Sequence, residues 1–139
     1  MKGIILLSHG PMAQGLYETT KWFMGEEIPQ YDYLCLKADD DLGYFDTKVK
    51  ELIEKNDSGE GVIIFTDLLG GTPYNRCVQF ACDNIDVFAG MNLTIVLEQL
   101  GRRLSDDYDF DTLIDVGRNG LTRLSFTASV NDNDDDFLE

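Results

Sequence analysis

A run of four branched apolar residues near the start of the chain, I-I-L-L at residues 4–7, stops at Ser8-His9-Gly10-Pro11. Such a run is typical of a strand buried on both faces, and Pro11 favours the start of a helix just after it. His9, the only histidine of the chain, would then lie at the carboxyl end of a parallel strand. Ligands bind at this rim of open α/β sheets, where the free N–H groups of helix N-termini favour anions.

Position alone leaves two interpretations of His9 open. It is either a hydrogen-bonded structural residue or a chemical group that faces a bound anion. A second stretch of the chain repeats the first, because V-I-I-F at residues 62–65 is followed by T-D-L-L-G-G-T-P-Y-N at residues 66–75. Asp67 thus follows a second buried strand, and we expect it to share the carboxyl rim with His9.

The two rim residues form a workable nucleophilic pair. The carboxylate of Asp67 can hold one ring nitrogen of His9 protonated and leave the other free to attack a phosphoryl group. Glycines in the loops let backbone N–H groups approach an anion closely, and Thr72 is expected to cap a helix that begins at Pro73. The candidate phosphoryl-binding residues are therefore Gly10, Gly70, Gly71 and Thr72.

Such a site would make phosphohistidine without a metal, and no cofactor is expected. The simpler alternative treats Asp67 as a helix-cap or turn residue and the glycines as turn formers. Three adjacent aspartates at residues 39–41 do not have the spacing of a calcium loop, so we interpret them as caps of the next helix. Cys35, Cys77 and Cys82 show no metal or disulfide spacing and are expected to be small buried residues.

The whole pattern alternates strand and helix. Strands are predicted at residues 4–9, 31–36, 62–65 and 85–90, and helices at 11–24, 42–53, 72–81, 92–100 and 112–119. This order predicts an α/β fold with an open, mainly parallel four-stranded sheet and helices on both faces. Residues 121–126 are predicted as a closing strand. Residues 1–130 would form one domain, and residues 131–139 an acidic tail without a core-forming pattern.

The chain carries 26 acidic against 11 basic side chains, a net charge of -15. This charge repels nucleic acid and anionic lipid, so no nucleic-acid partner is expected. Such a negative charge usually serves to keep a protein soluble. The alternative is that the acidic surface is a docking face for a basic protein. No signal peptide or run of transmembrane length is visible, which leads us to expect a cytoplasmic protein.

Three motifs together resemble the enzyme IIA domain of the mannose family of the bacterial phosphoenolpyruvate:sugar phosphotransferase system. They are S-H-G at residues 8–10, D-L-L-G-G-T-P-Y-N at 67–75 and A-G-M-N-L at 89–93. The resemblance spans nearly the whole chain in order and spacing. The chain differs in having Leu68-Leu69 where the family often has an aromatic residue, and in the acidic end after Asn131.

The resemblance implies a phosphoryl relay. His9 would match the phosphorylated histidine, which accepts a phosphoryl group from the phosphocarrier protein HPr and passes it to a IIB domain for sugar uptake. Asp67 would match the carboxylate that orients the imidazole, and Gly71 and Thr72 the loop beside the phosphoryl group. The membrane subunits IIC and IID would be indirect partners. A homodimer is also implied, in which residues 121–126 add an antiparallel strand to the partner's sheet.

Two alternatives to the sugar relay are considered. The phosphocarrier subunit of a dihydroxyacetone kinase shares the histidine strand, but the G-G-T-P-Y-N loop at residues 70–75 favours the transporter. A non-catalytic regulatory docking module would use the acidic surface and would not need His9. The sequence identifies neither the sugar nor a role for the acidic tail.

Overall fold

The computed structural model describes residues 1–126 of the chain and places the apolar runs in the strands of one sheet. The elements, in chain order, are β1 (Gly3–His9), α1 (Met12–Met24), β2 (Tyr31–Leu36), α2 (Leu42–Asn56), β3 (Val62–Thr66), α3 (Thr72–Cys77), the 3-10 turn η1 (Val78–Phe80), β4 (Ile85–Phe88), α4 (Leu93–Arg102), η2 (Arg103–Ser105) and α5 (Phe110–Asn119). The predicted alternation of strands and helices is confirmed.

The four strands lie in the order β2-β1-β3-β4 and every pairing is parallel. The chain therefore winds outward from β1 in one direction to β2, and in the other direction through β3 to β4. The crossover reverses between β1 and β3, which is the position where open α/β sheets bind ligands at the carboxyl ends of their strands. His9 is the last residue of β1, so the sheet order itself places it at this position.

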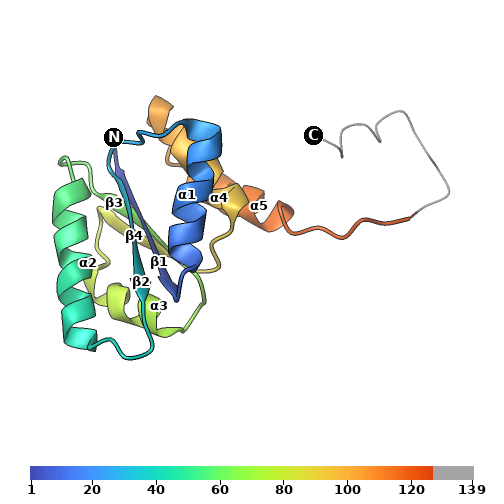
Figure 1. Cartoon of the computed structure of the whole chain (residues 1–139). Coiled ribbons are helices and arrows are strands. Elements are labelled where there is room, and N and C mark those ends of the chain that lie inside the picture. Colours follow the sequence, from blue (N-terminus) through green and yellow to red (C-terminus); the bar gives the residue numbers. More distant parts are fainter. Residues whose placement is uncertain (127–139) are drawn as a thin grey trace.

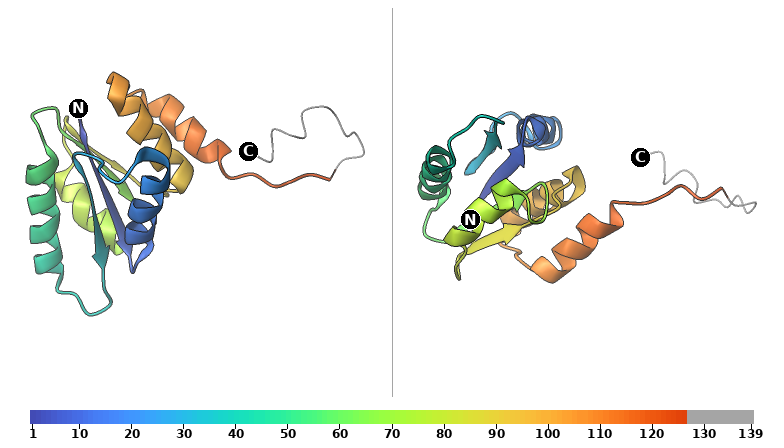
Figure 2. Two further views of the ribbon diagram at one scale, coloured as in Figure 1. Left: turned by 45° about the horizontal axis from the view of Figure 1, so that its top comes forward. Right: turned by 90° about the horizontal axis from the view of Figure 1, so that it is seen from below.

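Side chains of β1 alternate between two buried layers. Ile4 and Leu6 pack in a cluster with residues of α1, α4 and α5, whereas Ile5 and Leu7 pack with α2 and Cys77 of α3. Figures 1 and 2 show these helices covering the two faces of the sheet. All four side chains are fully buried, and each such burial contributes about 1.5–3 kcal/mol. This double-sided core fixes β1 and presents His9 at its end.

The third helix is shorter than predicted. Residues 72–81 were expected as one continuous helix, but α3 ends at Cys77, a 3-10 turn follows, and Ala81 is already extended with φ -63° and ψ 133°. The prediction that all three cysteines are buried is correct for Cys77, whereas Cys82 is exposed and Cys35 half-buried. Cys82 lies in the segment between η1 and β4, where it is not packed against the sheet by a helix.

The aspartates before α2 do not cap it as predicted. Asp41 occupies the N-cap position but makes no side-chain capping hydrogen bond. Oδ2 of Asp40 instead accepts a hydrogen bond from the backbone N–H of Lys37 at 2.7 Å, which closes the turn that leaves β2. By contrast, Asn92 caps α4, and its side chain accepts a hydrogen bond from the backbone N–H of Ile95 at 2.9 Å.

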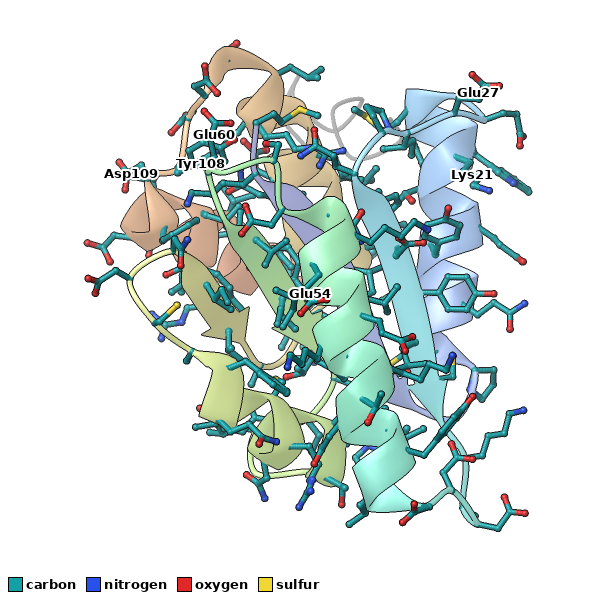
Figure 3. The ribbon with its side chains drawn as sticks, turned by 90° about the vertical axis from the view of Figure 1, so that its left-hand side faces the viewer. Lys21, Glu27, Glu54, Glu60, Tyr108 and Asp109 are labelled. Atoms are coloured by element: carbon teal, nitrogen blue, oxygen red, sulfur yellow. The ribbon has the colours of Figure 1, made fainter. Side chains whose placement is uncertain are left out.

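The amino edge of the sheet is closed by a buried arginine. Arg103 is 2% exposed, and its guanidinium donates to the backbone carbonyls of Lys2, Pro29 and Gln30. Nearby, the N–H of Lys2 donates to the hydroxyl of Tyr108 at 2.9 Å, and its ammonium reaches the carbonyl of Glu60 at 2.7 Å. Figure 3 shows Tyr108 and Glu60 beside each other at this end of the molecule.

Residues 121–126 form no strand within a single chain. They lead away from the body of the molecule (Figure 1), and Leu121, Leu124 and Phe126 are 87%, 75% and 102% exposed. The expected partner strand cannot form without a second chain, so a single chain neither supports nor contradicts it. The predicted domain end at residue 130 and the acidic tail at residues 131–139 lie outside the described residues. Within residues 1–126, no helix is long and apolar enough to cross a membrane.

Candidate functional site

His9 stands where the buried strand β1 meets solvent. The six residues before it in the strand are buried, and the imidazole itself is 47% exposed. In the sheet, the Cα partner of His9 on β2 is Leu36, and Leu7 pairs with Thr66 on β3. Asp67 directly follows Thr66, so the strand register places it opposite Ser8, one residue before His9. The prediction that His9 and Asp67 share the carboxyl rim is confirmed.

One oxygen of Asp67 holds both the ring and the backbone of His9. Oδ2 lies 2.8 Å from Nδ1 of the imidazole and accepts the backbone N–H of His9 at 2.9 Å. The second oxygen, Oδ1, accepts the N–H of Leu68 at 2.9 Å. The carboxylate is 11% exposed, so it is largely shielded from competing water. These bonds fix the ring orientation and favour the proton on Nδ1, which leaves the lone pair of the neutral ring on Nε2.

The electrostatics of Asp67 follow from these contacts. Partial burial raises the pKa of the carboxyl, but the hydrogen bonds from the ring and the backbone of His9 outweigh burial, and the net pKa is lowered. Asp67 therefore stays ionised over the whole neutral range. An ionised carboxylate at this distance would stabilise a positive charge that a reaction placed on the ring.

The glycine loop is shaped around the ring of His9. A Cβ on Gly71 would lie 2.7 Å from Cε1 of the imidazole, so a larger residue would displace the ring. Gly70 adopts φ +79°, a left-handed conformation that other residues rarely take. The side-chain amide of Asn75 donates to the carbonyl of Gly70 at 2.9 Å and braces this turn. The spacing of the motif does not reveal that Gly71 leaves room for the ring of His9.

Thr72 does not cap α3 as predicted. The extended residue before the helix is Gly71, with φ -74° and ψ 166°, and no side-chain capping bond is present. Capping geometry belongs to that extended residue, so Thr72 already lies in the first turn and its hydroxyl is not used to cap. Thr72 and His9 both line an open hollow of about 600 Å³, together with Gly10, Leu36, Lys37, Ala38, Asp40 and Leu42.

Backbone donors around the hollow are partly committed. The N–H of Gly10 donates to the carbonyl of Leu36 at 2.8 Å, and that of Gly71 to the carbonyl of Leu68 at 3.0 Å. Gly10 thus serves mainly as a left-handed turn, with φ +55°, after the histidine. The structure brings the candidate residues together, but it limits which of their amides can hold a bound group.

Ser8 has a role that the motif analysis missed. Its buried hydroxyl accepts the N–H of Ala13 at 2.7 Å and donates to the carbonyl of Gly10 at 3.0 Å. It therefore satisfies one of the free donors at the start of α1 and ties that helix to the turn after His9. The sequence feature that could have indicated this role is a serine placed just before the H-G-P turn that precedes a helix.

No group of three potential ligands from His, Cys, Asp and Glu is arranged to hold a metal ion among residues 1–126. Asp67 is hydrogen-bonded to the ring of His9, and Asp40 contributes a carboxylate to the lining of the hollow. The arrangement that is present suits nucleophilic attack by the imidazole on a phosphoryl group delivered through the hollow.

Comparison with known proteins gives consistent matches. The family model EIIA-man, described as PTS system fructose IIA component, matches residues 3–115. The mannose-specific EIIAB component of Escherichia coli K12 is 28% identical over 127 residues, 87% of this chain and 39% of that protein. The sorbose-specific EIIA component of Lacticaseibacillus casei is 29% identical over 138 residues, 96% of this chain and 99% of that protein. This chain thus spans about two fifths of the Escherichia coli protein and nearly all of the Lacticaseibacillus one.

Solved structures agree with the sequence matches. A crystal structure of the PTS IIA protein associated with the fucose utilization operon from Streptococcus pneumoniae superposes with a TM-score of 0.81, at 26% identity over 88% of this chain and 92% of that one. The mannose/sorbose-specific IIA subunit from Enterococcus faecalis gives a TM-score of 0.76, at 25% identity over 94% of this chain and 100% of that one.

Proposed function

This chain belongs to the EIIA-man family of PTS IIA components, and on that basis we propose that it is a phosphoryl-relay protein that uses His9 as its carrier. The single observation that carries the proposal is the bond between Asp67 Oδ2 and His9 Nδ1 at 2.8 Å. This bond leaves Nε2 of a half-exposed ring free to receive a phosphoryl group.

The transfer is a displacement at phosphorus. The lone pair on Nε2 of His9 attacks the phosphorus of a phosphohistidine on the donor protein, and the donor's P–N bond breaks. The electron pair of that bond returns to the donor's imidazole, and the proton on Nδ1 of His9 stays in its bond to Asp67. Delivery to the acceptor repeats the displacement with His9 as the leaving group. The ionised Asp67 stabilises the positive charge on the ring in both steps.

The phosphoryl oxygens would lie in the hollow beside the ring. Thr72 would offer the phosphoryl oxygens a hydroxyl that is not used for capping. The peptide dipoles at the start of α3 would add partial positive charge. Gly70, Gly71 and Gly10 shape the two turns that border this space. Together these residues complete a phosphoryl-binding site around a carrier histidine.

The partners follow from the relay. HPr would be the phosphoryl donor and a IIB domain the acceptor, with the IIC and IID subunits reached only through IIB. Three segments beside the site carry exposed apolar side chains: Met12 begins α1, Leu42 begins α2, and Leu68 follows Asp67 in the loop after β3. Their exposed fractions are 44%, 39% and 60%. An exposed histidine among apolar side chains suits transient docking of another protein. Through such partners the protein would be held beside a membrane transporter in the cytoplasm.

A homodimer that exchanges residues 121–126 is part of the proposal. β4 is an edge strand, and a hollow of about 430 Å³ beside it is lined by Val87, Phe88, Ala89, Gly90, Asn92, Ile95, Ile114, Gly117, Arg118 and Leu121. The exposed apolar side chains of residues 121–126 would be covered if this segment added antiparallel to the partner's edge.

The relay is tested by incubating the protein with phosphoenolpyruvate, enzyme I and HPr and measuring its intact mass. We expect one acid-labile phosphoryl adduct on the wild type and none on His9→Ala. A folded wild type that gains no adduct would overturn the relay and favour a non-catalytic docking module. An adduct that persists in His9→Ala would assign the carrier to another residue.

A further inference from the structure

Lys37 lies beside the carrier histidine and has no role in the site described above. It directly follows Leu36, whose Cα pairs with that of His9 and whose carbonyl accepts the N–H of Gly10 at 2.8 Å. Neighbouring strands run about 4.8 Å apart, so Lys37 leaves β2 one strand spacing from the turn after His9. Both residues line the same hollow of about 600 Å³.

Lys37 is the only lysine or arginine that lines this hollow within residues 1–126. Several other basic side chains of the described chain are engaged in ion pairs, namely Lys48 with Glu51, Lys55 with Asp32, Arg76 with Asp46 and Arg102 with Glu98. Within residues 1–126, Lys37 forms no ion pair, and this includes Asp40, which is only three residues away in the sequence. Asp40 bonds to the backbone N–H of Lys37 at 2.7 Å, not to its ammonium.

The negative charge around the hollow would favour a nearby cation such as the ammonium of Lys37. A phosphoryl group on His9 adds negative charge close to the carboxylates of Asp40 and Asp67, in a chain of net charge -15. Without a nearby cation, the loaded state would be destabilised by repulsion from both carboxylates. A lysine on a flexible four-carbon stem can move its charge to the phosphoryl oxygens when they arrive.

We propose that the Lys37 ammonium contacts the phosphoryl group on His9 and stabilises the phosphorylated state of the protein. This inference rests on the proposed relay function. Lys37 takes part in no bond making: it offsets charge, while Nε2 of His9 remains the atom that gains and loses the phosphoryl group. The residue thereby sets how strongly this chain holds the phosphoryl group relative to its donor.

The decisive quantity is the equilibrium constant for phosphoryl transfer between phospho-HPr and this protein. A change in docking alters the forward and reverse rates together and leaves this constant unchanged, so a shift in it reports the loaded state itself. We expect Lys37→Ala to lower the constant about three- to tenfold, the range for an exposed charge pair with a multiply charged partner. Lys37→Arg keeps the charge and should restore most of it.

Lys50→Ala is the matched control, because it removes the same charge from an exposed position on α2 that does not line the hollow. It should leave the equilibrium constant at the wild-type value. Equal constants for the wild type and Lys37→Ala, or equal losses in Lys37→Ala and Lys50→Ala, overturn the role of Lys37 and leave the relay intact. A wild type without any adduct overturns the relay and the role of Lys37 together.

Discussion

Oδ2 of Asp67 accepts two hydrogen bonds from His9, one from the backbone N–H and one from Nδ1 of the ring. The same oxygen thus fixes where β1 ends and how the imidazole is turned. It joins the ends of β1 and β3 at the reversal of strand order, and it links the fold to the proposed chemistry at a single atom.

Asp67→Asn should slow phosphoryl transfer about 10- to 100-fold while the fold is kept. The amide can still accept the ring N–H, but it lacks the charge that supports a cationic imidazole during exchange. Rapid-quench measurement of transfer from phospho-HPr checks this prediction. Transfer at the wild-type rate would show that the charge of Asp67 has no part in the reaction.

The same carboxylate makes stability depend on pH. The pKa of Asp67 is lower in the folded protein than its unfolded value of 3.8, so its contribution to stability is fully present above about pH 3.8 and is lost as pH falls through the folded pKa. We therefore expect the difference in unfolding free energy between the wild type and Asp67→Asn to shrink below that pH. Urea unfolding of both proteins between neutral and acidic pH measures it. If the difference in unfolding free energy did not change with pH, the hydrogen bonds between Asp67 and His9 would not stabilise the ionised carboxylate.

Gly71→Ala should impair transfer more than stability. Its Cβ would meet Cε1 of His9 at 2.7 Å, whereas its φ of -74° suits alanine. The imidazole must therefore shift, and a displacement of about 1 Å can cost on the order of 100-fold in rate. Transfer kinetics and thermal unfolding measured together check the prediction. Gly101→Ala is the control, since a Cβ there meets nothing within 4 Å; the idea fails if both variants transfer equally well.

Ser8→Ala should destabilise the protein by about 1–2 kcal/mol. It removes a buried hydroxyl and leaves the N–H of Ala13 and the carbonyl of Gly10 without that partner. Urea unfolding measures the loss. Ser58→Ala removes an exposed hydroxyl that donates to the carbonyl of Met1, and it should cost much less. A similar loss in both variants would argue against a special role for Ser8.

Leu124→Asp should weaken the proposed dimer. A charge at a 75% exposed position costs a monomer little, but it would be buried if residues 121–126 paired with a partner's β4. Sedimentation equilibrium of the full chain gives the dissociation constant. The exchange is contradicted if the wild type is monomeric, or if the variant dimerises as tightly as the wild type.

The strands and the first two helices could be predicted because their signals are local. The run at residues 31–36 and the helix that ends at Met24 match β2 and α1 closely, since periodicity and Gly/Pro boundaries agree there. The pairing of His9 with Asp67 was also predictable, because each follows a buried strand and parallel strands end on the same rim.

Contacts between loops that are far apart in the sequence could not be predicted. The fit of Gly71 against the His9 ring, and the position of Lys37 in the same hollow, depend on how three loops meet. Thr72 was misassigned as a cap because a one-residue shift of the helix start changes the role of its hydroxyl. Residues 121–126 have a strand pattern, but whether a strand forms depends on a neighbouring chain.

The buried Arg103 also bears on how the protein is made. It bonds to carbonyls 73, 74 and 101 residues earlier in the chain. A growing polypeptide therefore exposes β1 and β2 to the cell long before the ribosome has added the side chain that closes their amino edge. The final packing of this edge must wait until Arg103 has been synthesised, and a nascent chain that stops before residue 103 would lack it.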